Sequence, residues 1–189
     1  MRAFLLPLLA CCIAAPVLAQ TAKPTAKPAP ATTTAATAAT PAAPAKGGPT
    51  SIGSFDDWQA ATYDESGQKV CYAFTKARKS DPKIAGRSEA VLTVTQRASG
   101  RDAVALSAGY EYAANASVDL SIDKAKFDLY TAKRSAFARD GHAVVDALGK
   151  GKTILATSPH PQKKQVKDSF SPKGFAKAYD AINKACPPK

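Results

Sequence analysis

This 189-residue chain contains two histidines, His142 and His160, so few catalytic or metal sites that require histidine are possible. Neither has a second histidine or a cysteine at the spacing of a zinc site. A Ser–His–Asp arrangement can assemble from residues far apart in sequence, so it stays open, but no G-x-S-x-G nucleophile motif is present. We interpret both histidines as surface residues, and we expect no metal, no cofactor and no catalytic residue.

Three short runs imitate known sites. Asp56-Asp57 and Asp64-Glu65 are paired carboxylates, as glycosidases use for catalysis. The chain has few aromatic residues with which to line a sugar cleft, so we interpret both pairs as solvated turns. Gly151-Lys152-Thr153 resembles the end of a phosphate-binding loop. That loop would need glycine at position 146, which is aspartate, and it joins a strand to a helix rather than a helix to a strand.

The N-terminus has the form of an export signal. Arg2 precedes the apolar run 3–18, and Ala19 ends a cleavage site before Gln20. The run is short for a transmembrane helix, which needs about 20 residues. The alternative is a lipoprotein form anchored through Cys11. No later segment is apolar enough to span a membrane, so the mature chain should contain no transmembrane helix and should be periplasmic or secreted.

Residues 20–50 have a different composition from the rest. They contain 11 Ala, 8 Thr, 6 Pro and 3 Lys and no acidic residue, and no side chain larger than Thr or Lys is available to build a core. Such a segment does not offset its ordering entropy, so a disordered linker is predicted. The domain is then 51–189, with 22 basic and 15 acidic residues and a net charge of +7.

Export also sets the expected state of the cysteines. Cys11 and Cys12 leave with a cleaved signal, so Cys71 and Cys186 remain. An even pair in an oxidising compartment predicts a disulfide. The alternative is two free thiols.

Two clusters of basic residues indicate polyanion binding. Such patches attract polyanions by releasing their counterions. Export argues against chromosomal nucleic acid, which leaves anionic envelope components or a host-cell surface as partners. The alternative is a basic surface with no binding role. The candidate contacts are Lys76, Arg78, Lys79, Lys83 and Arg87 in one expected loop, and Lys163, Lys164 and Lys167 in another.

The elements that must position these residues are mostly strands. Lys69–Phe74 alternates, with Val70, Tyr72 and Phe74 on one face, and 117–123 alternates with Val118, Leu120 and Ile122 inward. Turn residues between neighbouring runs favour antiparallel hairpins. A short helix fits 141–148. The expected strands are 55–63, 69–74, 90–97, 103–110, 117–123, 126–130, 153–157 and 165–170.

A final helix is the clearest element. Ser171 is a good N-cap and Pro172 suits the first helical position. Phe175, Ala178, Tyr179, Ile182 and Cys186 recur at helical spacing on one stripe. Cys186 on the buried stripe could meet a strand cysteine, which independently supports the pairing with Cys71. Trp58 is expected to pack in the core or on the sheet, the alternative being an exposed recognition residue.

The chain resembles the bacterial invasion-associated locus B family. The resemblance begins at Ile52–Trp58, continues through Lys69-Val70-Cys71, and closes at Asp168–Phe175 and Ala185-Cys186. Pro172 stands where the family usually has leucine. The resemblance spans about 51–187. It implies export and the fold. It implies a contribution to host-cell invasion only weakly, because most relatives have no agreed catalytic residues.

These observations predict a mainly β fold, an antiparallel sandwich or partly open barrel with a short helix and a C-terminal helix packed on it. The predicted function is a non-enzymatic envelope or secreted interaction module. The alternatives are a periplasmic structural or stress protein and a periplasmic hydrolase. A pocket uniting Asp56 or Asp57 with His142 would favour the hydrolase.

Overall fold

The structure is a computed structural model that describes residues 48–162 and 165–188. The expected signal peptide, nearly all of the expected linker, Cys11, Lys163 and Lys164 lie outside the described residues. The described part contains eleven strands and two helices. They are β1 (Thr50–Phe55), β2 (Trp58–Glu65), β3 (Gln68–Lys76), β4 (Lys79–Asp81), β5 (Val91–Arg97), β6 (Gly100–Ser107), β7 (Ser117–Ile122), β8 (Ala125–Ala132), β9 (Ser135–Ala138), α1 (Gly141–Lys150), β10 (Ile154–Pro159), β11 (Gln165–Phe170) and α2 (Phe175–Ala185).

All eleven strands form one antiparallel sheet in the order β1-β2-β3-β5-β6-β9-β8-β7-β10-β11-β4. The sheet curls back on itself, because its last strand, β4, follows β3 after only two residues. Ala77 N–H donates to the Ala90 carbonyl at 2.9 Å, and Arg78 N–H donates to the Ser169 carbonyl at 2.8 Å. The two-residue link therefore passes the chain from the β5 side to the β11 side. This is the partly open barrel among the predicted architectures.

Hydrophobic alternation located most strands correctly. The predicted hairpins at 55–74 and 117–130 are β2–β3 and β7–β8, in antiparallel register. The strand predicted at 103–110 begins three residues earlier, at Gly100, and ends at Ser107 as β6. Three strands were not predicted: β1, β4 and β9. β4 and β9 are short and β4 has no apolar residue, so pairing with a neighbouring strand defines them. β1 has six residues, but Ile52 and Phe55 are its only apolar side chains and they do not alternate.

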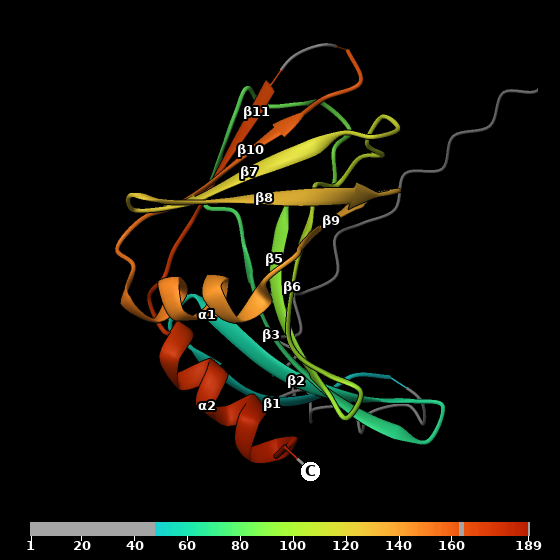
Figure 1. Ribbon diagram of the computed structural model, residues 1–189, viewed down its shortest axis with the longest axis vertical. Helices are drawn as coiled ribbons and strands as arrows, with labels where there is room; N and C mark the ends of the chain where they lie inside the picture. The colour runs from blue at the N-terminus through green and yellow to red at the C-terminus, as the bar shows by residue number, and fades with distance from the viewer. Residues whose placement is uncertain (1–47, 163–164, 189) are drawn as a thin grey trace, which may run out of the picture. The chain divides into compact units, whose positions relative to one another are not determined.

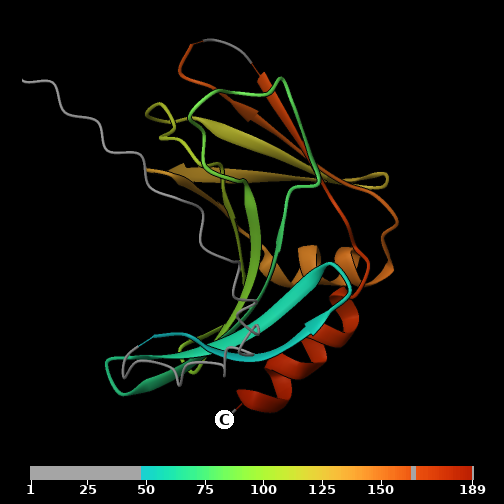
Figure 2. The same ribbon diagram turned by 180° about the vertical axis from the view of Figure 1, so that it is seen from behind.

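Both helices lie on the same side of β2, β3, β5 and β6 (Figures 1 and 2). Helix α1 begins after Asp140, whose carboxylate accepts from Ala143 N–H at 3.0 Å, and it runs two residues past the predicted end. Strands β7, β8, β10 and β11 form a separate group beyond α1 in both views. The helices therefore cover one face of the first half of the sheet.

The start of α2 differs from the prediction. Its N-cap is Gly174 rather than Ser171, and Ser171 Oγ instead accepts from Lys173 N–H within the preceding turn. Gly174 has φ +92°, and a Cβ there would lie 1.9 Å from the Phe55 carbonyl oxygen. Close approach to the β1–β2 turn and a left-handed backbone both require glycine, so the helix cannot begin until the next residue.

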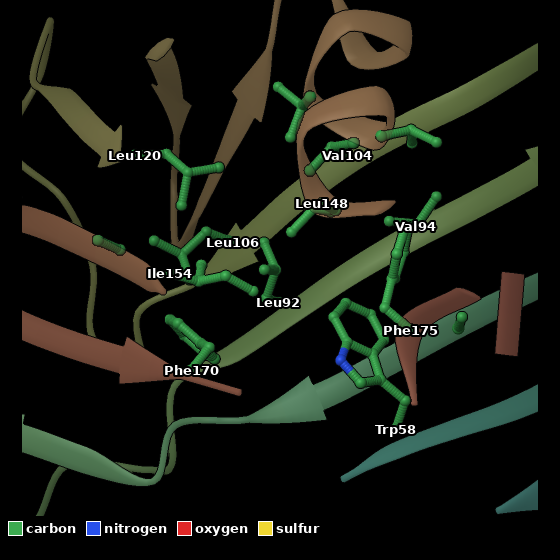
Figure 3. Close-up of a cluster of buried hydrophobic side chains, with 14 of the residues drawn as sticks. Trp58, Leu92, Val94, Val104, Leu106, Leu120, Leu148, Ile154, Phe170 and Phe175 are labelled. Carbon is green, nitrogen blue, oxygen red and sulfur yellow. The ribbon is translucent and has the colours of Figure 1, made fainter. Parts of the chain in front are cut away.

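The core fills the space between the helices and the curled sheet. Figure 3 shows Trp58 beside Phe175, with Leu92 and Leu106 between them and the Ile154–Phe170 region. Trp58 and Phe175 pack edge to face at 4.9 Å between ring centroids. Aliphatic side chains from both halves of the sheet join one continuous cluster, so the described residues from β2 to α2 pack as one unit.

The two faces of β3 are used differently. Cys71, Ala73 and Thr75 point to the helices and are buried. Tyr72 and Phe74 point to the opposite, outer face and are only half-buried. Apolar residues occur on both faces of β3 because one face packs against α2 and the other carries aromatic rings that face solvent.

Candidate functional site

The predicted Cys71–Cys186 disulfide is present, with the two Cα atoms 5.9 Å apart. It joins β3 to the residue after α2 and closes a loop of 115 residues. Cys71 is fully buried and Cys186 nearly so. Arg101 supports the same end of α2, donating to the Cys186 carbonyl at 2.6 Å. The disulfide therefore fixes the terminal helix against the first hairpin.

Pairing between β4 and β11 places Lys167 of the second predicted basic cluster on the same face as Lys79 of the first. Lys79 lies opposite Ser169, and Lys167 lies opposite Asp81. Both lysine side chains are exposed on the outward side of these strands. Lys83 follows β4 and lines a cavity of about 570 Å³ with Arg78 and Lys79. We call Arg78, Lys79, Lys83 and Lys167 the basic face.

Arg87 does not belong to that face, contrary to its grouping in sequence. Its side chain is 5% exposed, and its guanidinium meets the fully buried carboxylate of Asp168 with two contacts, at 2.9 and 2.6 Å. Its Nε donates to the Ala108 carbonyl at 2.6 Å, and it lies over the Tyr110 ring. Arg87 is thus committed to an internal ion pair and is unavailable to an external polyanion.

Two other predicted contacts have acidic neighbours. Lys76 pairs with Glu89 at 2.6 Å, and Arg78 approaches Asp57 at 3.5 Å. Both basic side chains remain more than half exposed, so these pairs are weak and exchangeable. Within residues 48–162 and 165–188, no ion pair involves Lys79, Lys83 or Lys167.

Trp58 has no exposed surface. Its indole N–H donates to the Ser171 carbonyl at 2.8 Å, and its ring packs on Phe175. No part of the ring can meet an external ligand, so its role is to join β2 to the start of α2.

A histidine–carboxylate pair went unnoticed in the sequence because its members are 40 residues apart. His142 Nδ1 lies 3.0 Å from Asp102 Oδ2, while the other oxygen of Asp102 accepts from Gln96 Nε2 at 2.6 Å and from Tyr179 Oη at 2.7 Å. The carboxylate is buried, whereas the imidazole is 74% exposed. Asp102 therefore joins β5, β6, α1 and α2 at one point.

The environment shifts both groups of this pair. Burial raises the pKa of Asp102, but hydrogen bonds from Tyr179, Gln96 and His142 outweigh it, and the pKa lies below its usual value. The hydrogen bond to Asp102 raises the pKa of His142, and the negative charge of Asp146 adds to this effect. The arrangement favours the imidazolium–carboxylate form.

The same pair resembles the base and orienting acid of a hydrolase. In the described part of the chain, His142 Nε2 approaches only Asp146, at 4.0 Å, and no hydroxyl or thiol donates to it. Asp56 lines a cavity of about 460 Å³ at the C-terminal end of α1 with Leu148, whereas His142 lies in the first turn of that helix. The geometry gives the imidazole a carboxylate partner but no nucleophile.

The motifs that imitate known sites serve as turns. Asp64 accepts from Gly67 N–H at 2.6 Å in the β2–β3 turn. The Gly151-Lys152-Thr153 run binds a carboxylate rather than a phosphate: Asp123 accepts from the Lys152 and Thr153 N–H groups at 3.0 and 2.9 Å. The Thr153 side chain and backbone N–H donors lower the pKa of Asp123. This contact closes the link between α1 and β10.

The described residues lack both a metal-ligand cluster and a membrane-spanning helix. Between residues 48 and 188, with 163 and 164 left out, no three His, Cys, Asp or Glu side chains are grouped to hold a metal ion. None of the helices in the same ranges has the length and apolar character needed to cross a membrane.

Comparison with solved structures supports the fold. The crystal structure of invasion associated protein B from Bartonella henselae matches with a TM-score of 0.50 and 18% identity, over 70% of this chain and 95% of that chain. At this identity the match concerns the fold. No curated protein matches this chain.

Comparison with family models supports the resemblance seen in the sequence. The model of the invasion associated locus B protein matches residues 58–183, from Trp58 at the start of β2 to the last turn of α2. This range is two-thirds of the chain and includes α1, most of α2 and ten of the eleven described strands. The chain therefore belongs to the invasion associated locus B family.

Proposed function

We propose that this protein is an exported, non-enzymatic interaction module that contacts anionic envelope components or a host-cell surface through its basic face. The observation that carries this proposal is the pairing of β4 with β11, which places Lys79 and Lys167 on one outward surface although they are 88 residues apart in sequence. A cavity beside them, lined by Lys83 and Arg78, adds room for an anionic group.

Several features support export. The N-terminal sequence has the pattern of a cleavable signal, and the Cys71–Cys186 disulfide is typical of an oxidising compartment. The family name and the similar Bartonella henselae protein refer to invasion, which fits a role at the cell surface or beyond it.

Protease treatment of intact and outer-membrane-permeabilised cells tests the location. Lys46-Gly47 is a trypsin site, whereas Lys23 and Lys27 precede proline and resist cleavage. Cleavage after Lys46 on intact cells would support contact with a host surface, and cleavage only after permeabilisation would support contact inside the envelope. Fractionation of the uncleaved chain with the cytoplasm would contradict export.

Vesicle sedimentation tests the basic face. Each lysine near an anionic membrane contributes about 1 kcal/mol, so Lys79→Gln with Lys167→Gln should weaken binding to phosphatidylcholine–phosphatidylglycerol vesicles by roughly tenfold or more at low salt. Lys124→Gln with Lys126→Gln, at the β7–β8 turn, removes the same charge elsewhere and should change binding far less. Equal losses in both variants, or no vesicle binding by the unmodified protein, would contradict the assignment.

A further inference from the structure

The cavity beside the basic face is lined by β4 and by the loop that follows it, from Lys83 to Ala90. The segment from β4 to β5, green in the ribbon, lies beside β11 in both views (Figures 1 and 2). The cavity has a volume of about 570 Å³, and the basic side chains of Arg78, Lys79 and Lys83 line it. All three are exposed, so an anion can reach them from solvent.

Both sides of this cavity are fixed by contacts inside the fold. On the β4 side, Ser80 Oγ donates to the buried carboxylate of Asp168 at 2.6 Å. On the loop side, Arg87 pairs with the same carboxylate, and its Nε donates to the Ala108 carbonyl at 2.6 Å. Because these contacts already hold the loop, an anion that enters the cavity does not have to order it, which lowers the entropic cost of binding.

Two acidic residues near the cavity already have basic partners. Glu89 is part of the lining, and Lys76 pairs with it at 2.6 Å. Asp57 approaches the guanidinium of Arg78 at 3.5 Å. These pairs are exposed and weak, but they keep either carboxylate from facing the cavity as an isolated negative charge.

Lys79 and Lys83 are left without such a counter-charge. Across the described part of the chain, neither of them is in an ion pair. Asp81 lies between them in sequence, but it is opposite Lys167 in the β4–β11 ladder and is not part of the cavity lining. The cavity therefore presents two uncompensated ammonium groups, with the guanidinium of Arg78 beside them.

We propose that this cavity binds a phosphomonoester group, an inference that rests on the proposed function of the basic face and names its ligand. A phosphomonoester has three terminal oxygens and a charge of about −1.5 to −2 at pH 7. These properties match two uncompensated lysines and the forked donors of Arg78. A carboxylate or a phosphodiester has a single negative charge and leaves one lysine unmatched. Apolar lining for the carbon body of the ester comes from Ala77, Ile84 and Ala90.

Vesicle sedimentation with two lipids of different phosphate chemistry tests the inference. Phosphatidic acid carries a phosphomonoester and phosphatidylglycerol a phosphodiester, and the two sets of vesicles are matched in surface charge by their zeta potentials. The unmodified protein should bind the phosphatidic acid vesicles about fivefold more tightly, the effect of one additional lysine contact. Lys83→Gln should abolish this preference. Lys167→Gln, on the same face but outside the cavity, should weaken binding to both lipids and keep the preference.

Glycerol 3-phosphate distinguishes a soluble ester from a lipid headgroup. A saturable shift of its phosphorus-31 resonance that Lys83→Gln removes would show that the soluble ester is sufficient. Preference for phosphatidic acid without such a shift would assign the site to a lipid headgroup. Equal binding to both sets of vesicles without a shift, or a preference that persists in Lys83→Gln, would overturn the inference and leave the basic face in place. Absence of the shift and of binding to either set of vesicles would overturn the proposed function as well.

Discussion

Asp168 and Asp102 are both buried carboxylates, but the protein compensates their charges in different ways. Asp168 meets the guanidinium of Arg87 with two contacts and accepts from Ser80 Oγ at 2.6 Å. Asp102 accepts from the neutral donors Gln96 and Tyr179, and among the described residues the one cationic group that contacts it is the exposed imidazole of His142. One carboxylate has a guanidinium counter-charge inside the fold, and the other shares its charge with an imidazole whose pKa the pairing raises.

The difference relates to what each carboxylate joins. The Arg87–Asp168 pair ties the loop after β4 to β11, beneath the strands that present the basic face. Asp102 ties both helices to β5 and β6 on the other half of the sheet. The basic face therefore rests on an ion pair with a guanidinium, whereas the contact between the helices and the sheet depends on the protonation of His142. The following predictions test this contrast, from the largest expected effect to the smallest.

Removing the permanent counter-charge should have the largest effect. Arg87→Met leaves the Asp168 carboxylate buried without a cation, and breaking a buried pair in this way costs about 3–5 kcal/mol of unfolding free energy. Urea unfolding at pH 7 measures the loss. Adding Asp168→Leu should restore much of it, because the uncompensated charge is then gone. A similar loss from Arg78→Met, whose side chain is mostly exposed, would contradict this account.

Removing the shared charge should have a smaller effect. Asp102→Asn retains a side chain tolerated at φ +55° but loses the charge-assisted bonds, and we expect about 1–3 kcal/mol of destabilisation at pH 6. The same unfolding measurement applies, with the exposed Asp119→Asn as the matched control. If Asp102→Asn were as damaging as Arg87→Met, the two carboxylates would not differ as proposed.

The smallest effect should be the pH dependence of His142. Since Asp102 and Asp146 raise its pKa in the folded state, its contribution is complete below the unfolded value of about 6.5 and is lost as pH rises through the higher folded pKa. Unmodified protein should therefore lose more stability between pH 6 and pH 8 than His142→Gln does. Identical profiles for the unmodified protein and His142→Gln would show that the pair contributes nothing.

Patterns read along the chain located elements whose residues are neighbours in sequence. Period-two alternation placed β7 with Val118, Leu120 and Ile122 inward, and all three are buried. The helical stripe ending at Cys186 supported the predicted disulfide with Cys71, which is present. Both patterns depend on local geometry, in which alternate residues of a strand, or residues three and four apart on a helix, share a face. The helix start was missed because only contact with Phe55 shows why Gly174 must end the turn.

The positions of the basic residues and aromatic rings in the fold depend on pairing between distant strands. Lys79 and Arg87 belong to one cluster in sequence, yet one is exposed on β4 and the other is buried against Asp168. Strand register gathers Tyr72, Phe74, Tyr130 and Phe137 onto one face from segments more than 50 residues apart.

The sequence by itself therefore determined the family, the mainly β composition, the two helices and the partners of the disulfide, because each is recorded in residue type or local spacing. Tertiary structure alone decided which charges reach solvent, which histidine meets a carboxylate, and which face of β3 is outward. Those properties depend on strand order and register, which bring together side chains that no local pattern connects. After β3 the sheet curls so that β4 pairs with β11, and this pairing forms the basic face.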